Sequence, residues 1–189
     1  MRLLPKFDAL VRLHRTGLPH PDWRFSDQKT DLPPQPWSTA DVGWSLRQCP
    51  LSYYAFGLPS RHYITYAEAL LMNRIWIRET HMATVSYPSW RFICSGCCLL
   101  TPALLTVEAV SGSPAGLLAG TKTPELVAQF DRFSHQRYLM QGSPAVIPDG
   151  LLERIVSYSG AIDVNTEVTV EWSITHNGRL VFHDWVQVI

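Results

Sequence analysis

The sequence predicts an α+β fold in which central helices pack on an antiparallel β-sheet, with an extended Pro-rich N-terminal arm before that domain. Three observations lead to this prediction. Thr65 and Glu68 form the Thr-x-x-Glu signature of a helix start, followed by an amphipathic run. Apolar and polar residues alternate from residue 168 to 174, as in a strand with one buried face. Prolines concentrated between residues 17 and 44 resist helix formation and sheet pairing.

Length and composition indicate one folded domain with an arm. The chain has 189 residues, of which 46% are hydrophobic and 17% charged, a globular composition. We expect residues 1–45 to form an N-terminal arm, a basic amphipathic segment plus a Pro-rich linker, and residues 46–189 a single globular domain. No apolar run is long enough to span a bilayer, and no secretory signal is recognisable. The net charge of zero does not favour a protein that binds a polyanion.

Two segments of the arm suggest binding functions. Residues 1–15 predict an amphipathic helix that could lie on an anionic membrane surface or pack on its own domain. A second segment could act as a polyproline-type docking peptide, or only as a linker. The basic residues of the first segment are Arg2, Lys6, Arg12 and Arg15, and the docking-like residues of the second are Pro33, Pro34, Pro36 and Trp37.

The domain itself is predicted to begin with a strand and a turn at residues 51–64. A capped helix over residues 66–79 follows, then a second, buried helix over residues 89–100. Residues 101–120 are small and apolar and predict an exposed loop, which is uncommon in a monomer unless something binds it. After a short helix at residues 124–133, Asn177-Gly178 predicts a two-residue hairpin turn between two strands.

Chemistry-bearing motifs are few. Cys94 and Cys97 have the Cys-x-x-Cys spacing of a zinc knuckle, but no second ligand pair exists and their neighbours are apolar, which favours buried free thiols. His183 and Asp184 are adjacent in a predicted strand, so they should point to opposite faces. Neither a phosphate-binding glycine loop nor a nucleophile elbow is present. The sequence therefore gives no argument for an enzyme.

Part of the chain resembles a known family. The pattern Thr65-Tyr66, Trp76, Pro88-Ser89-Trp90-Arg91 and Thr101-Pro102-Ala103-Leu104-Leu105 is similar in order and spacing to the central region of rhabdovirus matrix proteins. A second similarity runs over residues 148–164. The resemblance thus extends over a stretch of about 100 residues, from 65 to 164.

The resemblance implies a non-enzymatic viral matrix protein without cofactor or metal. Such a protein self-associates under the envelope and bridges membrane and nucleocapsid in assembly and budding. The implied partners are further copies of the chain, an anionic membrane surface, the viral nucleocapsid, the envelope glycoprotein tail and host budding factors. The implied location is the virion beneath the envelope, and the cytoplasm and inner membrane surface of the host cell.

The same resemblance assigns roles to residues. The self-association or membrane loop would be Ala103, Leu104, Leu105 and Val107, and the basic residues of the arm would contact membrane and nucleocapsid. Pro33, Pro34, Pro36 and Trp37 are similar to a late-domain motif but lack its tyrosine.

Two alternatives come from other classes of protein. The first is a zinc-knuckle nucleic-acid-binding adaptor subunit of a ribonucleoprotein complex, using Cys94 and Cys97. The second is a small enzyme with a site built from dispersed residues such as His135, His183 and Asp184.

Overall fold

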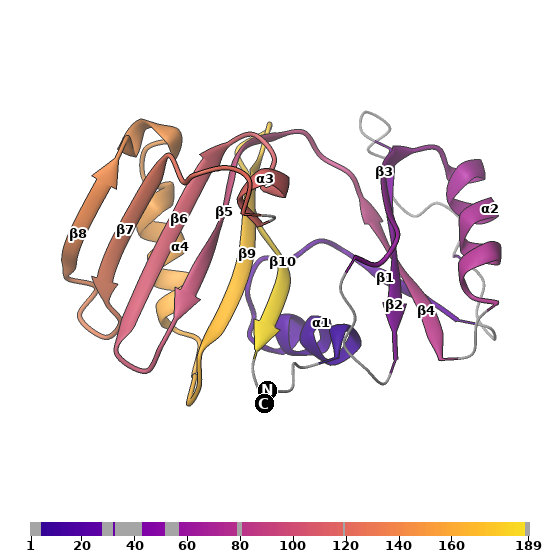
Figure 1. Cartoon of the computed structure of the whole chain (residues 1–189), viewed down its shortest axis with the longest axis horizontal. Helices are drawn as coiled ribbons and strands as arrows, with labels where there is room; N and C mark the ends of the chain where they lie inside the picture. The colour runs from indigo at the N-terminus through magenta and orange to yellow at the C-terminus, as the bar shows by residue number, and fades with distance from the viewer. Residues whose placement is uncertain are drawn as a thin grey trace. The chain divides into compact units, whose positions relative to one another are not determined.

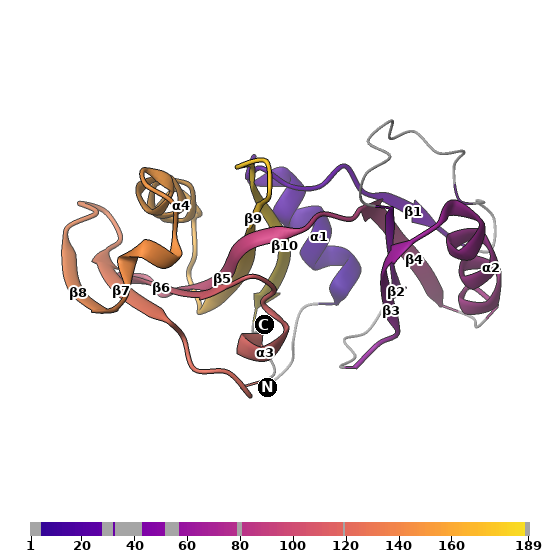
Figure 2. The same cartoon turned by 90° about the horizontal axis from the view of Figure 1, so that it is seen from above.

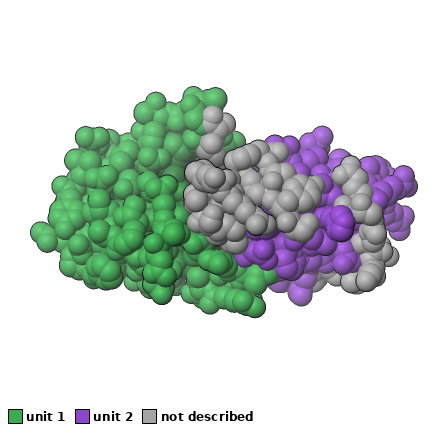
Figure 3. Space-filling model, turned by 60° about the horizontal axis from the view of Figure 1, so that its bottom comes forward, with its two compact units in different colours: residues 1–3, 9–20, 91–189 green, residues 4–8, 21–90 purple. Residues whose placement is uncertain are grey.

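The computed structural model describes residues 5–27, 32, 43–51, 57–78, 81–118 and 120–187. The chain divides into two compact units (Figure 3). Unit 1 comprises residues 1–3, 9–20 and 91–189, and unit 2 comprises residues 4–8 and 21–90. The described residues form ten strands and four α-helices, and the strands make two antiparallel sheets.

Unit 2 is built on a four-stranded sheet with the order β1-β4-β2-β3. Helix α2 lies along this sheet (Figure 1) and packs on β2 and β4. Its apolar residues meet Trp44 and Leu46, which are buried against Ala69. The elements are β1 (Arg24–Ser26), β2 (Trp44–Pro50), β3 (Ser60–Ile64), α2 (Tyr66–Trp76) and β4 (Met82–Pro88).

The predicted start of α2 is confirmed. The Glu68 amide donates to Thr65 Oγ1 at 3.3 Å, and the Thr65 amide donates to Glu68 Oε2 at 2.7 Å. These two bonds form the capping box, which satisfies amide groups that a helix start leaves without intrahelical partners.

Unit 1 contains a six-stranded sheet with the order β10-β9-β5-β6-β7-β8. Helix α4 covers one face of this sheet (Figure 2) and packs on β5 and β6. Helix α1 (Lys6–Arg15) contributes its residues from Ala9 onward. The other elements are β5 (Phe92–Leu100), β6 (Leu104–Ser111), α3 (Ala115–Leu118), β7 (Leu126–Asp131), β8 (Arg137–Gly142), the 3-10 turn η1 (Pro144–Val146), α4 (Leu151–Gly160), β9 (Val168–Thr175) and β10 (Leu180–Gln187).

The predicted C-terminal hairpin is also confirmed, but its loop has three residues, 176–178, where the sequence predicts a two-residue turn. Strands β9 and β10 pair in antiparallel fashion around the turn at Asn177-Gly178. Gly178 has a φ of +78°, and its amide donates to the Thr175 carbonyl at 2.8 Å. A positive φ of this kind is the reason for glycine in such a turn.

The predicted fold class is wrong, because the structure is mostly β-sheet and does not place central helices on one sheet. Residues 89–100, predicted as a buried helix, contain β5, and the predicted helix at 124–133 contains β7. The predicted loop at 101–120 contains β6 and α3. Strand β5 carries apolar residues on both faces, among them the exposed Ile93 and the buried Cys94, so its sequence lacks a period of two.

The predicted extended arm differs from the structure as well. Its described residues include α1 and β1, and the backbone amide of Phe182 donates to the carbonyl of Pro19 at 2.6 Å. Residues 33–42 lie outside the described part of the chain.

Candidate functional site

A row of carboxylates crosses the unit 1 sheet. The strand register places Glu108 of β6 opposite Cys97 of β5, Cys97 opposite Glu171 of β9, and Glu171 opposite Asp184 of β10. Directly opposed residues in antiparallel strands share one face of the sheet. We call Glu108, Glu171 and Asp184 the carboxylate row.

This row lies on the sheet face opposite α4. The α4 face carries Cys98, whose thiol contacts Ser159 of α4, and Phe182, whose ring centroid is 6.3 Å from that of Tyr158. Cys97 is the neighbour of Cys98 along β5, so its side chain points the other way. The carboxylate row therefore does not face the core beneath α4.

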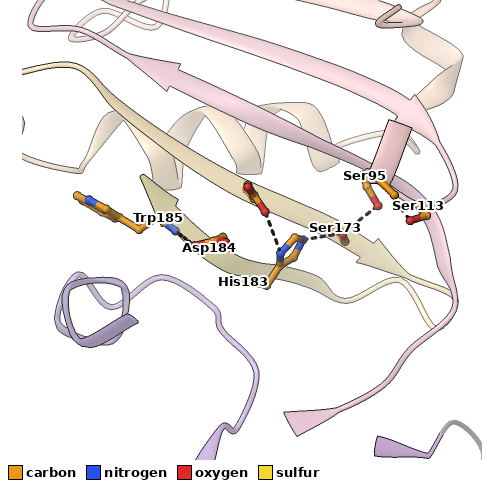
Figure 4. A network of polar contacts seen from close by, with 8 residues as sticks. Ser95, Ser113, Ser173, His183, Asp184 and Trp185 are labelled. Atoms are coloured by element: carbon orange, nitrogen blue, oxygen red, sulfur yellow. Dashed lines mark hydrogen bonds and ion pairs between the residues drawn. The ribbon is translucent and has the colours of Figure 1, made fainter. Parts of the chain in front are cut away.

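A β-bulge in β10 brings His183 to the same face as Asp184. The register shifts between Phe182 and Asp184, so His183 is an additional residue in that strand. Its ring points toward β9 (Figure 4), with Nε2 2.9 Å from Ser173 Oγ. The prediction that His183 and Asp184 lie on opposite faces is therefore wrong, because the bulge breaks the alternation on which it depends.

The hydrogen bonds beyond Ser173 determine which group donates between Ser173 and His183. The carbonyl of Gly112 can only accept, and the Ser95 hydroxyl donates to it at 2.6 Å. The Ser173 hydroxyl donates to Ser95 Oγ at 2.8 Å. Each hydroxyl has one proton, so Ser173 must accept its bond from His183 Nε2–H.

The other ring nitrogen of His183 faces a carboxylate. Its Nδ1 lies 3.7 Å from Glu171 Oε2. If the ring is neutral with its proton on Nε2, the lone pair of Nδ1 points toward the Glu171 oxygen and the two repel each other. A second proton on Nδ1 removes this repulsion. An ion pair between His183 and Glu171 therefore forms when the ring is protonated on both nitrogens.

These contacts exclude the reading of Ser173, His183 and Glu171 as a hydrolytic triad. In such a triad the histidine accepts the proton of the serine nucleophile. Here Ser173 gives its proton to Ser95, and it is completely buried. The network instead holds the Glu171 side chain in place from β10.

Cys97 remains a protonated thiol within the row. Burial raises the pKa of Cys97, and the carboxylate of Glu108 raises it further. The thiol donates to Glu108 Oε2 at 3.6 Å. Cys97 is therefore a neutral neighbour of two carboxylates and a poor nucleophile at neutral pH.

The structure separates the cysteines that a zinc knuckle would need. Cys94 and Cys97 are three residues apart in one strand, so their side chains point to opposite faces of the sheet. Burial raises the pKa of Cys94 to about 12, which opposes the thiolate that zinc requires. Within the described ranges no group of three or more His, Cys, Asp or Glu side chains could hold a metal ion by itself.

Unit 2 contains a smaller polar cluster. Ser45 Oγ is 2.8 Å from His62 Nδ1 and 2.6 Å from Ser89 Oγ, and Ser89 Oγ accepts from the Tyr63 amide at 3.0 Å. Desolvation lowers the pKa of His62, and the cation of Arg47 lowers it further. Ser45 and Ser89 are buried, so this cluster joins β2 to β3 and the end of β4 and does not present a nucleophile.

The residues predicted to form an adhesive loop do not share one environment. Ala103 and Leu104 are exposed at the β5–β6 turn and the start of β6, whereas Leu105 and Val107 are fully buried in the unit 1 core. A role of this segment in self-association stays a prediction, but only its first two residues are accessible.

The predicted basic arm is divided in the same way. Lys6 is buried, Arg15 is exposed, and Arg12 donates to Gln187 Oε1 at 2.6 Å. Arg2 and the late-domain-like residues Pro33, Pro34, Pro36 and Trp37 lie outside the described residues. The described helices include none that is long and apolar enough to cross a membrane.

Comparison with known proteins gives matches only among solved structures, since no family model and no curated protein matches. One match is the D-alanine–D-alanine ligase of Bacillus anthracis complexed with ATP, at 13% identity and a TM-score of 0.52, over 96% of this chain and 52% of the ligase. Another is the ADP complex of PurK, N5-carboxyaminoimidazole ribonucleotide synthetase, at 12% identity and a TM-score of 0.57, over 97% and 44%. The fold is that of ATP-grasp ligases.

A third match supports the same fold. The D-alanyl-alanine synthetase A of Vibrio cholerae has a TM-score of 0.54 at 7% identity, over 96% of this chain and 54% of the synthetase. The chain thus spans about half the length of the ligases it matches. At these identities the similarity establishes the fold and leaves substrates and partners open.

This similarity corrects the functional predictions from sequence. The rhabdovirus matrix assignment is wrong, and with it the predicted non-enzymatic role in the virion, because the solved structures with this fold are ATP-dependent ligases. The zinc-knuckle alternative has no support either. The matrix resemblance depended on the order and spacing of residues between 65 and 105, a stretch in which the structure has one helix followed by strands.

Proposed function

We propose that this chain is the nucleotide-binding part of an ATP-dependent ligase, and that the carboxylate row of unit 1 binds the metal–nucleotide complex. Two structures with this fold contain ATP or ADP. The observation that carries the proposal is the pairing of Glu171 with Asp184 on the sheet face away from α4.

The chemistry of these side chains fits Mg²⁺. This cation prefers oxygen ligands, and it is commonly bound through one or two carboxylates together with substrate phosphates. The strand register places Glu171 directly opposite Asp184, which is only 2% exposed.

The surrounding residues would orient these ligands. The His183 ring lies beside Glu171, with Nδ1 3.7 Å from Oε2, and the backbone amide of Trp185 donates to Asp184 Oδ1 at 2.7 Å. Hydrogen bonds of this kind around a ligand raise its affinity by holding it in the binding orientation. A bound Mg²⁺ would neutralise phosphate charge during transfer of a phosphoryl group.

The proposal is tested by nucleotide binding to the full chain. We expect MgATP to bind the wild-type protein in isothermal titration calorimetry, and EDTA to weaken that binding. Glu171→Gln removes one charged ligand while keeping the shape of the side chain, so we expect at least about a tenfold loss of MgATP affinity.

Glu167→Gln is the matched control. Glu167 is exposed just before β9 and undergoes the same change of charge outside the row. Its affinity should remain within about twofold of the wild type. A wild-type protein that does not bind MgATP, or two variants with equal losses, would contradict the proposal.

A further inference from the structure

The outward surface of α2 is unusually apolar for a short surface helix. Leu71 is 63% exposed and Ile75 is 51% exposed. The opposite side of the helix buries Ala69 and Asn73 against the sheet of unit 2. The two exposed residues are four positions apart, so they form one continuous apolar patch on the helix surface.

One charged residue flanks this apolar patch at each end, and the two residues have opposite signs. Glu68 lies three residues before Leu71, and Arg78 lies three residues after Ile75, in the turn beyond the C-cap. Steps of three, four and three residues are the spacing of a helix–helix seam. We call Glu68, Leu71, Ile75 and Arg78 the α2 seam, and all four side chains are exposed.

The α2 seam is complementary to the same seam of a second copy that runs in the opposite direction. In an antiparallel pair with a two-fold axis at Asn73, Leu71 of one copy meets Ile75 of the other. The same axis places Glu68 opposite Arg78 at both ends of the pair. A two-fold interface requires such a self-complementary surface.

We propose that two copies of this chain associate through the α2 seam as an antiparallel helix pair. This inference concerns unit 2 and does not depend on the proposed nucleotide function. The apolar centre supplies the attraction, and the two acid–base contacts fix the antiparallel direction.

The size of the seam sets the strength of the association. Helix α2 has 11 residues and is therefore about 16 Å long, which is small for a stable protein–protein interface. We therefore expect a weak dimer that forms at high protein concentration. The exposed face of α2 also carries Arg74, so its described charges are the Glu68 carboxylate and the cations of Arg74 and Arg78. The self-complementary order of the α2 seam, and not the sign of its charge, favours a second copy of the chain over a membrane surface.

Sedimentation velocity over a range of concentrations tests the proposal. The wild type should shift from monomer to dimer as concentration rises. Leu71→Gln should weaken the dimer at least tenfold, and so should Arg78→Glu, which places two carboxylates together at each end. Arg61→Glu on β3 makes the same charge change on an exposed residue outside the α2 seam, and should leave the dimer unchanged.

A mixing experiment tests the geometry directly. Glu68→Lys and Arg78→Glu should each fail to pair with themselves, whereas an equimolar mixture restores both acid–base contacts and should restore the dimer. Circular dichroism verifies that Glu68→Lys, which alters the capping box, retains its helix.

Three results would overturn the proposal. They are a wild type that stays monomeric at every concentration, a dimer that Arg78→Glu leaves unchanged, and a mixture that stays monomeric. Flotation of the wild type with anionic vesicles without any dimer would assign this surface to a membrane instead.

Discussion

Ser173 Oγ and His183 Nε2 lie 2.9 Å apart on neighbouring strands, with the histidine as the donor. The direction of this bond follows from the two serine hydroxyls beyond it, each of which gives its single proton onward. A contact that resembles a catalytic serine–histidine pair therefore positions the His183 ring beside Glu171. The 2.9 Å distance alone would allow a catalytic serine, but the donor in this bond is the histidine, which excludes Ser173 as a nucleophile activated by His183.

The serine chain predicts strong coupling between two buried residues. Ser173→Ala leaves Ser95 without its donor and His183 without its acceptor, so it should cost about 1–3 kcal/mol of unfolding free energy. Ser95→Ala should have a similar effect. The double variant should cost less than the sum of the two, because it removes both partners of their shared bond, with a coupling of about 0.5–3 kcal/mol in urea unfolding.

The control for this double-mutant cycle is a serine that does not belong to the chain of hydrogen bonds. Ser157→Ala changes an exposed serine of α4 and should be additive with Ser173→Ala. If the losses of unfolding free energy in Ser95→Ala and Ser173→Ala are additive, the hydrogen bond from Ser173 to Ser95 is contradicted, and with it the donor role of His183 Nε2.

Cys97 offers a prediction about thiol reactivity. The nearby carboxylate of Glu108 contributes to the raised pKa of this thiol, after burial. Glu108→Gln removes that negative charge, so the pKa of Cys97 should fall and its thiolate fraction at a given pH should rise. Alkylation by iodoacetamide at pH 9 should then become several-fold faster, as a change of one pKa unit is about tenfold in thiolate.

The alkylated residue is identified by mass spectrometry of tryptic peptides. Glu125→Gln is the control, since its carboxylate pairs with Lys122, with the two charged atoms 2.8 Å apart, and is not among the groups that shift the pKa of Cys97. An unchanged alkylation rate in Glu108→Gln would show that burial alone keeps this thiol protonated.

Sequence patterns predicted the structure correctly where particular residues mark the start of a helix or a turn. Thr65 with Glu68 marked the start of α2, and Asn177-Gly178 marked the β9–β10 turn. Such patterns failed at β5, because its nine residues are largely apolar on both faces of the strand and resemble a buried helix. This error placed a second central helix at residues 89–100, where the structure has β5.

The candidate site was harder to predict from sequence than the hairpin that contains most of it. The alternation in β9 placed Glu171 on the polar face, but nothing in the sequence signals the bulge at His183. Glu108 lies 63 positions before Glu171, and only the strand order brings them onto one face. Sites assembled by register need the sheet topology, which local periodicity does not supply.

Gly96 gives a prediction about the packing beneath this site. A Cβ atom at this position would lie 1.8 Å from the Glu108 carbonyl oxygen and 2.6 Å from Cζ2 of Trp172. Both neighbours belong to the interior of the sheet and its core, so Gly96→Ala must displace a strand or a fully buried ring. We expect a loss of about 1–3 kcal/mol in unfolding free energy, the usual cost of overpacking a core.

Gly112→Ala separates this clash from ordinary backbone strain. Gly112 has a φ of +72° and no neighbour within 4 Å of an added Cβ, so alanine there should cost only about 1–2 kcal/mol of left-handed strain. Near-ultraviolet circular dichroism should change in Gly96→Ala, because Trp172 moves, and should stay unchanged in Gly112→Ala. A Gly96→Ala protein with wild-type stability and an unchanged tryptophan signal would contradict the close packing of β5 against β6 and Trp172.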